Sequence, residues 1–259
     1  MTVAVITGAS AGLGAEFAKL FAKDKHDLLL VARRLDRLEV IAKQLSDAHG
    51  VQVHVLACDL GMPDGASKVV AEAQRLNLEI DFLVNNAGFG TSGAFVTSDT
   101  GREMEMVQVN IATLVELTRL VLPQMVARKR GRVLNIGSTA GFQAGPYMAT
   151  YYASKAFVNL FTEAISYELR GTGVTATVSC PGATATEFAL VAGNAKSRLF
   201  RMGAASAPQV ASEAYRAMLA GKPMIVHGLK NKLVVQSLRV SPRAVIRAVA
   251  AALNPVPKP

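Results

Sequence analysis

Charged residues, cysteines and long hydrophobic stretches are all scarce in this sequence. Only 18% of its 259 residues are charged and 51% are hydrophobic, a balance that excludes an intrinsically disordered chain. Charges or turn residues interrupt each apolar run before it reaches the ~20 residues that a membrane-spanning helix requires. The composition therefore predicts a globular protein with a large buried core and without a transmembrane helix.

The sequence also lacks the spacing of cysteines and histidines that metal sites and disulfide frameworks require. Cys58 and Cys180 lie near the ends of expected strands, and both are interpreted as reduced core residues. The histidines are scattered, so we expect no metal site; they are His26, His49, His54 and His227. No Gly-x-Ser-x-Gly elbow is present, which disfavours a serine hydrolase. The first apolar run has no positively charged region before it and no cleavage site, so we expect no signal peptide and a cytoplasmic location.

An excess of positive charge is the strongest bias in the composition. The formal net charge of +9 is compatible with nucleic acid, an acidic membrane surface, or an anionic cofactor or substrate. Zinc-finger spacing, aromatic RNA-binding motifs and long Lys/Arg runs are absent, so nucleic acid is not an expected partner. Lys129, Arg130 and Arg132, which surround Gly131, are interpreted as a solvent-exposed loop between a helix and a strand.

Strand-like and helix-like stretches alternate along most of the chain. This alternation is typical of an α/β fold with a doubly wound, Rossmann-type sheet, mostly parallel, with helices on both faces. Seven strands are expected, at Val3–Thr7, Asp27–Ala32, Val51–Ala57, Ile80–Val84, Arg132–Ile136, Val174–Ser179 and Met224–Val226. The main helices are expected at 14–23, Leu35–Ala48, Arg102–Arg128, Met148–Arg170 and Pro208–Ala220. One domain is predicted over residues 1–253, followed at 254–259 by a proline-rich tail that we expect to be disordered.

A glycine-rich segment separates the first strand from the first helix. Its small side chains lie where a helix N-terminus can approach a pyrophosphate closely. The spacing of Gly8, Gly12 and Gly14 is Gly-x-x-x-Gly-x-Gly, which differs from the commoner Gly-x-Gly-x-x-Gly fingerprint. A tight turn would explain one of these glycines but not three of them beside Ser10. The segment therefore indicates a dinucleotide-binding loop.

The second expected strand is followed by arginines rather than by an acidic residue. An NAD enzyme usually carries a carboxylate about 20 positions after the glycine-rich loop, where it binds the adenosine ribose 2′-hydroxyl. Here Arg33 and Arg34 occupy that place, and guanidinium groups can pair bidentately with a 2′-phosphate. The sequence therefore predicts NADP(H) rather than NAD(H), against the alternative of two arginines that are merely solvated at a strand end.

Five motifs make the chain resemble the short-chain dehydrogenase/reductase family over nearly its whole length. In order, they are the segment from Thr7 to Gly14, Asp59 after the third strand, Asn85-Asn86-Ala87-Gly88, Ser138 with Tyr151-x-x-x-Lys155, and Pro181-Gly182-x-x-x-Thr186. The resemblance implies an oxidoreductase with these cofactor contacts: Gly8, Ser10, Gly12, Leu13, Gly14, Asp59, Leu60, Asn86, Ala87, Gly88, Tyr151, Lys155, Pro181, Gly182, Thr184 and Thr186. It further implies that Asp59 contacts the adenine, that Thr186 holds the nicotinamide carboxamide, and that Asn110 joins a proton relay with Lys155.

Ser138, Tyr151 and Lys155 also suit carbonyl reduction on chemical grounds. Besides a hydride, the reaction needs a proton donor and a hydrogen bond that polarises the carbonyl oxygen. Tyr151 and Lys155 are four residues apart in an expected helix, so the ammonium can lower the phenol pKa from ~10 toward the working pH. Ser138 follows the fifth strand, at the edge where such sheets place their sites. We therefore predict hydride transfer between NADP(H) and a carbonyl/alcohol pair, with Tyr151 as the acid or base.

Two alternatives to this interpretation stay open. Tyr152 lies three residues from Lys155, so helical geometry alone separates it only slightly from Tyr151. The family motif assigns the role to Tyr151 and leaves Tyr152 for packing or pocket lining. The second alternative is a non-catalytic NADP(H)-binding regulator, which would need no acid at the reacting centre. The intact set of Ser138, Tyr151 and Lys155 disfavours it.

The C-terminal third of the chain bears on the substrate and the partners. A lid at about 187–207 contains Phe188, Leu190 and Phe200 and favours a hydrophobic substrate, unless these side chains simply pack on the sheet. Residues 230–253 are basic and amphipathic, so membrane-surface binding is an alternative. Helices that cover the site or form a subunit contact are preferred for this segment. The resemblance implies a homodimer or homotetramer associated through the two long helices.

Overall fold

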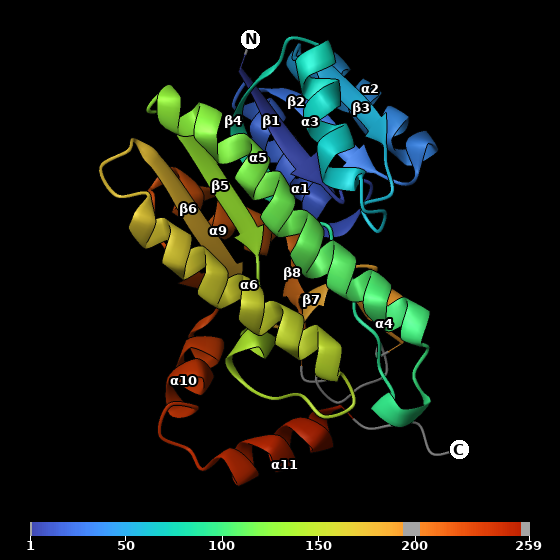
Figure 1. The fold of residues 1–259 in the computed structure, drawn as a ribbon, viewed down its shortest axis with the longest axis vertical. Coiled ribbons are helices and arrows are strands. Elements are labelled where there is room, and N and C mark those ends of the chain that lie inside the picture. Colours follow the sequence, from blue (N-terminus) through green and yellow to red (C-terminus); the bar gives the residue numbers. More distant parts are fainter. Residues whose placement is uncertain (1, 194–202, 255–259) are drawn as a thin grey trace.

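A seven-stranded parallel sheet forms the centre of the computed structural model, which describes residues 2–193 and 203–254 (Figure 1). Its strands are β1 (Thr2–Thr7), β2 (Asp27–Ala32), β3 (Val53–Ala57), β4 (Glu79–Asn85), β5 (Gly131–Ile136), β6 (Val174–Cys180) and β9 (Met224–Val226). Because they lie in the order β3-β2-β1-β4-β5-β6-β9, the winding direction changes between β1 and β4. Open sheets of this kind bind ligands at that switch point, beyond the carboxyl ends of the strands.

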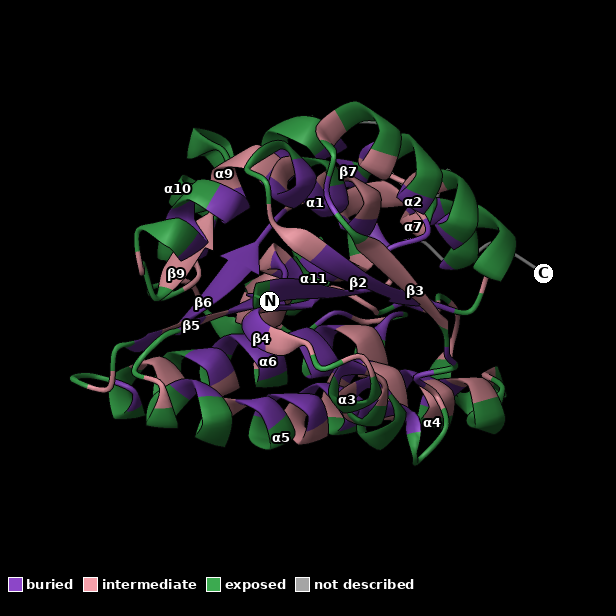
Figure 2. Ribbon diagram, turned by 90° about the horizontal axis from the view of Figure 1, so that it is seen from above, coloured by how far each residue is buried: buried purple, intermediate pink, exposed green. Residues whose placement is uncertain are grey.

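Helices cover both faces of the sheet (Figure 2). One face carries α1 (Gly12–Lys23), α2 (Leu35–His49) and α9 (Ala207–Leu219); the other carries α3 (Gly65–Arg75), α4 (Thr100–Val107), α5 (Thr113–Ala127) and α6 (Ala149–Glu168). The strands β1 and β2 are buried on both faces, which is why they are continuous apolar runs rather than alternating ones. The predicted doubly wound fold is confirmed.

The long helix expected at Arg102–Arg128 is divided by a π-helical turn at Gln108–Ala112, with α4 before it and α5 after it. By length and composition the whole segment Thr100–Ala127 could cross a membrane, so the expectation that no segment qualifies was wrong. Met106 and Met125 are fully buried in the core. Packing therefore explains part of the apolar character of this segment, since 44% of its most apolar window is buried in the fold.

Short elements follow β6 and lie beyond the carboxyl ends of the strands, with α10 and α11 lowest in Figure 1. They are β7 (Thr184–Ala185), which pairs with β8 (Ala205–Ser206), α7 (Phe188–Val191), α10 (Leu229–Ser237) and α11 (Arg243–Leu253). Part of the predicted lid, 194–202, lies outside the described residues. Asn254 is buried, and its amide donates to the Tyr152 hydroxyl at 3.0 Å, so the predicted disordered tail was wrong at this residue. Residues 255–259 also lie outside the described part.

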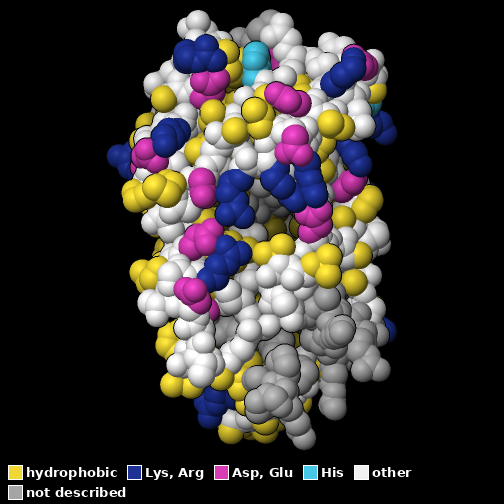
Figure 3. Space-filling view, turned by 90° about the vertical axis from the view of Figure 1, so that its right-hand side faces the viewer, with side chains coloured by type: hydrophobic (Ala, Val, Ile, Leu, Met, Phe, Trp, Pro, Cys, Tyr) yellow, Lys and Arg dark blue, Asp and Glu magenta, His cyan; other side chains and the backbone are white. Residues whose placement is uncertain are grey.

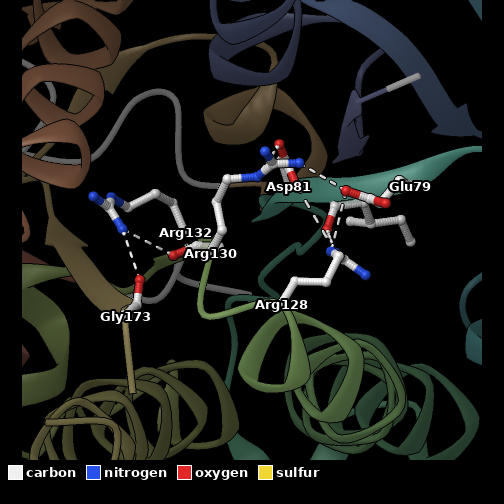
Figure 4. A network of polar contacts seen from close by, with 8 residues as sticks. Glu79, Asp81, Arg128, Arg130, Arg132 and Gly173 are labelled. Carbon is white, nitrogen blue, oxygen red and sulfur yellow. Dashed lines mark hydrogen bonds and ion pairs between the residues drawn. The ribbon is translucent and has the colours of Figure 1, made fainter. Parts of the chain in front are cut away.

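Arginines and acidic residues form ion pairs at the opposite, amino edge of the sheet (Figure 4). Arg130 contacts Glu79 at 2.7 Å and Asp81 at 3.0 Å, and Arg128 contacts Glu79 at 3.2 Å. Arg132 donates to backbone oxygens of its own strand and of the chain before β6. Arg130 is exposed, as predicted for this basic loop, and still pairs with acidic side chains of β4, whereas Arg132 lies within β5.

Candidate active site at the carboxyl edge of the sheet

The glycine-rich loop turns sharply between β1 and α1. Gly8 and Gly12 have φ angles of +64° and +56°, which favour glycine, and a Cβ on Gly14 would lie 2.3 Å from the Gly8 carbonyl oxygen. Ala11 precedes the first residue of α1, and no described side chain forms a capping hydrogen bond at this N-terminus. The first N–H groups of this helix therefore remain open toward an anion.

The segment after β4 forms hydrogen bonds with the residues around this loop. The Asn86 side-chain amide donates to the carbonyl oxygens of Thr7 at 2.9 Å and Gly8 at 3.2 Å. The Thr7 hydroxyl in turn accepts hydrogen bonds from the backbone N–H groups of Asn86 and Ala87, each at 3.0 Å. Gly88 follows, and a Cβ there would lie 3.0 Å from the Asn110 side-chain oxygen. The Asn-Asn-Ala-Gly motif therefore holds the glycine-rich loop in place.

The arginines after β2 take different positions. Arg34 donates to the Ser10 hydroxyl through Nε at 3.2 Å and Nη2 at 3.0 Å, so it lies directly beside the glycine-rich loop. Arg33 instead pairs with Glu105 at 3.3 Å. On the face shown in Figure 3, Lys and Arg side chains lie next to Asp and Glu side chains around a hollow. The sequence prediction thus grouped two arginines that the fold separates.

Two further residues complete a charged cluster that the sequence prediction missed. The Glu187 carboxylate binds Arg34 Nη1 at 3.0 Å and Arg37 Nη1 at 2.7 Å, one oxygen to each. The hydrogen bonds from Arg37 and Arg34 lower the pKa of Glu187. Arg37 follows Arg34 by three residues in the first turn of α2, a spacing that could have revealed it. The guanidinium groups of Arg34 and Arg37 therefore bind the two oxygens of one carboxylate.

Asp59 and Leu60 lie after β3 at the same edge of the sheet. Asp59 Oδ1 accepts from the backbone N–H of Gly61 at 2.9 Å. Leu60 is buried, and its carbonyl oxygen accepts from the Thr113 hydroxyl at 2.8 Å. Both predicted residues therefore have well-defined positions, while their contact with an adenine stays a prediction.

The segment after β6 folds back over the glycine-rich loop. The Thr184 hydroxyl donates to the Gly182 carbonyl at 3.1 Å, and the Thr186 hydroxyl accepts from the Phe188 N–H at 3.3 Å. A Cβ on Gly12 would lie 3.2 Å from the Thr186 side chain. The Pro181 carbonyl accepts from the backbone N–H of Thr139, which follows β5, at 2.9 Å and so ties the segments after β5 and β6 together.

Ser138 and Tyr151 meet where β5 ends and α6 begins. Ser138 precedes the short 3₁₀ helix Thr139–Phe142; its hydroxyl accepts from Ala140 N–H at 3.0 Å and contacts the Pro181 carbonyl at 3.3 Å. Both side chains line the same cleft, and Ser138 acts against the burial that raises the pKa of the Tyr151 phenol. The predicted polarising group and the predicted acid are therefore adjacent.

Lys155 contacts the backbone rather than the phenol. Its Nζ donates to the Ile136 carbonyl at 2.7 Å and lies 5.9 Å from the centre of the Tyr151 ring. Burial raises the pKa of Tyr151 to about 12, and Ser138 acts in the opposite direction. Burial lowers the pKa of Lys155 to about 8. Burial therefore sets the direction of the phenol's pKa shift in this arrangement, and the tuning of Tyr151 by Lys155 stays a prediction.

Tyr152 has its own packing site. Its hydroxyl accepts from Asn254 at 3.0 Å, and its ring lies so close to Gly145 that a Cβ there would fall 2.2 Å from it. Burial raises its pKa, while the hydrogen bond from Asn254 acts the other way. Since Ser138 contacts Tyr151, the geometry favours Tyr151 over Tyr152 as the acid more clearly than helical spacing could.

Asn110 and Asn159 hold the surrounding backbone. In the π-helical turn, Asn110 accepts from the Phe89 N–H at 3.1 Å and donates to the Phe89 carbonyl and the Ser154 hydroxyl, each at 3.0 Å. Its predicted relay with Lys155 is therefore not a direct side-chain contact. Asn159, which the sequence prediction missed, donates to the Ser138 carbonyl at 3.1 Å. It follows Lys155 by one helical turn, a polar position on the buried face of α6 that could have indicated it.

These groups line one cleft of about 290 Å³ at the switch point of the sheet. Its lining includes Gly8, Gly12 and Leu13 of the glycine-rich loop together with Ser138, Tyr151 and Lys155. The apolar side chains of Met148, Phe188, Val191 and Leu253 also line it. The arrangement can hold a long anionic ligand and a hydrophobic one side by side.

The chain resembles named relatives in sequence and solved structures in fold. The chain is 35% identical to the ketoacyl reductase HetN of Nostoc sp. and to the 17-beta-hydroxysteroid dehydrogenase type 3 of Rattus norvegicus, over 69% and 71% of its length. It spans about three fifths of each relative, 62% and 60%. A short-chain dehydrogenase from Sphingobium yanoikuyae in complex with NADPH has a TM-score of 0.81 at 31% identity, covering 93% of this chain and 94% of the other. A family member from Burkholderia phymatum in complex with NAD has a TM-score of 0.82 at 25% identity, covering 91% and 92%.

The family model described as short chain dehydrogenase matches residues 2–196. That range runs from β1 through the segment after β6, so it includes every motif on which the resemblance was based. The match therefore covers the cofactor loop and the Ser-Tyr-Lys set within one continuous domain. On this ground, the chain belongs to the short-chain dehydrogenase/reductase family of oxidoreductases.

Proposed function

We propose that this protein reduces the carbonyl group of a hydrophobic substrate with NADPH, or oxidises the corresponding alcohol with NADP⁺. The observation that carries the proposal is that Ser138, Tyr151 and Lys155 line one cleft together with the glycine-rich loop and a set of apolar side chains. An acid placed beside a polarising hydroxyl is the arrangement that carbonyl reduction requires.

The residues present fit a nicotinamide dinucleotide. The open N-terminus of α1 and the space left by Gly14 form a cradle that a side chain at this position would fill. Arg34 and Arg37 hold the Glu187 carboxylate, and the same two guanidiniums suit a 2′-phosphate. Structures of relatives contain NADPH in one case and NAD in another, so the preference for NADP(H) depends on these arginines.

In the proposed reaction, bound NADPH supplies the hydride to the carbonyl carbon. Ser138 donates a hydrogen bond to the substrate oxygen, and Tyr151 gives its phenolic proton to the same oxygen as the alcohol forms. With a pKa of about 12, Tyr151 carries that proton at neutral pH. Lys155, held by the Ile136 carbonyl, supplies positive charge near the phenolate that remains. Asn159 keeps Ser138 in position from α6.

The apolar side chains that line the cleft support a hydrophobic substrate. Phe188 lies against Tyr151 with ring centres 5.1 Å apart, and Val191 and Leu253 extend the same wall. Relatives named for ketoacyl and hydroxysteroid substrates act on compounds of this kind. We infer an extended or bulky ketone whose carbonyl reaches Ser138 and whose remainder contacts Phe188.

A cofactor-consumption screen tests the proposed function. Purified protein is mixed with NADPH or NADH and with a panel of ketones, aldehydes, steroids, 3-oxoacyl thioesters and small polar sugars. We expect substrate-dependent loss of NADPH absorbance with apolar ketones and slower loss with NADH. Strict preference for small polar sugars would contradict the hydrophobic substrate, and tight NADPH binding without any turnover would favour a non-catalytic binding protein.

A further inference from the structure

The outer surface of α11 is apolar, whereas a helix on a protein surface normally turns polar side chains to the solvent. Ala250 is buried toward the protein, while Val245 and Val249 are each 54% exposed. Ala248 and Ala252 are exposed beside them, on the side of the helix opposite Ala250. The line of α11 farthest from the protein therefore consists of small apolar side chains.

α10 and the turn after it continue this apolar surface. Val235 is buried, whereas Leu229 and Leu233, one helical turn apart, are 72% and 63% exposed. Val240, between the two helices, is 86% exposed. We call α10, this turn and α11 the C-terminal helical pair, residues 229–253. The helical pair lies at the end of the molecule beyond the carboxyl edge of the sheet (Figure 1).

Positive charge borders the apolar surface without any acidic residue in the segment. The helical pair contains five basic residues, and no Asp or Glu follows Glu213 in the sequence; the five are Lys230, Lys232, Arg239, Arg243 and Arg247. Arg243 and Arg247 are one turn apart and both are exposed, and their spacing of seven and three residues before Ala250 places them toward the Ala250 side of α11 rather than on its apolar line. A second copy of the chain docked here would add the same positive charge, so repulsion disfavours self-association through this surface.

Exposed leucine and valine side chains flanked by Lys and Arg fit the headgroup region of a bilayer that contains anionic lipids. We propose that the C-terminal helical pair docks the protein on an anionic lipid surface. The apolar side chains enter the boundary between headgroups and acyl chains, and the five basic side chains bind the lipid phosphates. Docking goes beyond the proposed reaction and does not depend on it.

The helical pair also lies next to the cleft. Leu253, at the end of α11, lines the cleft, and the following Asn254 bonds to Tyr152. A docked protein therefore places this part of its cleft near the bilayer, where hydrophobic carbonyl compounds are concentrated.

Vesicle sedimentation tests the docking surface. The full-length protein, without cofactor or substrate, is mixed with vesicles of phosphatidylcholine alone or of phosphatidylcholine with phosphatidylglycerol, at low and at physiological salt. We expect binding to the anionic vesicles at least roughly tenfold stronger than to the neutral ones, and weaker binding as salt rises. The double variant Arg243→Gln/Arg247→Gln should lose on the order of tenfold in binding to anionic vesicles.

A matched pair of variants distinguishes binding through the C-terminal helical pair from non-specific binding to vesicles. Val245→Asp places an acid on the apolar face of α11, and Val40→Asp makes the same change at a valine of α2 that is 57% exposed. We expect Val245→Asp to lose roughly tenfold or more in vesicle binding and Val40→Asp to bind like the wild type. Thermal melts of both variants check that they fold.

Three outcomes would overturn the docking proposal. They are no binding to anionic vesicles, equal binding to neutral and anionic vesicles, and equal losses in Val245→Asp and Val40→Asp. If the wild type does not bind vesicles and Val245→Asp lowers the mass measured by light scattering, the C-terminal helical pair is a subunit contact instead. Because the assay contains no cofactor or substrate, failure of docking and failure of the proposed reaction remain distinguishable.

Discussion

At the scale of single residues, burial moves the pKa values of Tyr151 and Lys155 in opposite directions. The phenol, with a pKa of about 12, stays protonated at pH 7 and suits a proton donor. The Lys155 amine, with a pKa of about 8, is held below its usual value because its charge is buried. The same burial that prepares the site for chemistry therefore works against the stability of the fold.

Replacing Lys155 should expose this conflict. Its folded-state pKa lies below its unfolded value, so the amine destabilises the protein below about pH 10, fully so below about pH 8. We expect Lys155→Met to raise the free energy of unfolding at pH 7 by about 1–2 kcal/mol, after loss of the hydrogen bond to Ile136, and to abolish turnover. Denaturant melts and NADPH oxidation assays measure the two effects. A destabilised variant would show that the hydrogen bond outweighs the burial of the charge.

Arg34 and Glu187 offer a second pair of changes. Arg34→Ala removes the guanidinium beside Ser10, so NADPH affinity should fall at least roughly tenfold with little change for NADH. Glu187→Gln removes the carboxylate that competes for Arg34 and Arg37, so NADPH should bind roughly two- to fivefold more tightly. Fluorescence titration measures both affinities. Arg33→Ala, whose side chain pairs with Glu105, should have the smaller effect; unchanged NADPH affinity in both arginine variants would contradict the NADP(H) preference.

At the scale of elements, a buried polar chain joins β6, β9 and α9 beneath the segment after β6. The Ser179 hydroxyl lies 2.8 Å from His227 Nε2, and His227 Nδ1 lies 2.9 Å from the Glu213 carboxylate. Ser179 is fully buried, so this Ser-His-Glu set has no access to a substrate and serves to hold the elements together. Burial lowers the pKa of His227, with Glu213 acting against the shift and Lys232 adding to it.

This arrangement predicts that acid weakens the fold. Because the folded-state pKa of His227 lies below its unfolded value, the unfolded chain binds more protons as pH falls below about 6.5, and stability is lost over that range. We expect the unfolding free energy to fall from about pH 7 to about pH 5, and His227→Asn to be about 1–3 kcal/mol less stable at pH 7 with a flatter pH dependence. Denaturant melts at several pH values measure this. His49→Gln, at the end of α2, is the control and should keep the wild-type slope; an unchanged slope in His227→Asn would refute the assignment.

The strands β1 and β2 were predictable from sequence because they are buried on both faces and are therefore continuous apolar runs between turn residues; β6 is equally buried but alternates apolar residues with Thr and Ser. The π-helical turn at Gln108–Ala112 could not be predicted from sequence, because its residues also fit the periodicity of one continuous α-helix. α3 was not among the expected helices, although Ala66, Val69 and Ala73 recur at helical spacing on its buried side. Local sequence patterns therefore identified strands and helices, whereas a break within a helix depends on tertiary packing.

The same contrast holds for the site. The glycine spacing and the pair Tyr151 and Lys155 lie within single segments, so their proximity followed from sequence separation alone. The contacts from Glu187 to Arg34 and from Asn159 to Ser138 join residues that are far apart in the chain. No local pattern contains such contacts, because the order of the strands in the sheet creates them.

At the scale of the whole molecule, exposed apolar side chains lie along α6. Leu160 and Tyr167 are 67% and 66% exposed, and Phe157 stacks on Phe161 with ring centres 5.7 Å apart. An exposed patch of this kind on a long helix marks a protein interface. Together with the family resemblance, it supports association through α6 rather than through the basic helical pair.

We therefore expect the protein to be a dimer or tetramer in solution. Leu160→Asp places a charge in the α6 patch and should shift the mass measured by light scattering toward the monomer. Val96→Asp, at a valine that is 91% exposed outside α6, is the control and should leave the mass unchanged. A wild-type protein that stays monomeric at high concentration would contradict the prediction.

The most direct measurement of the central claim is NADPH oxidation by the wild type, Tyr151→Phe and Tyr152→Phe with one substrate found in the screen. Removal of the hydroxyl beside Ser138 takes away the proton donor, so Tyr151→Phe should lose at least ~10²-fold in kcat while it still binds NADPH. Tyr152→Phe loses only the bond to Asn254 and should keep most of the activity. Turnover by Tyr151→Phe at the wild-type rate, or loss of turnover only in Tyr152→Phe, would contradict the account.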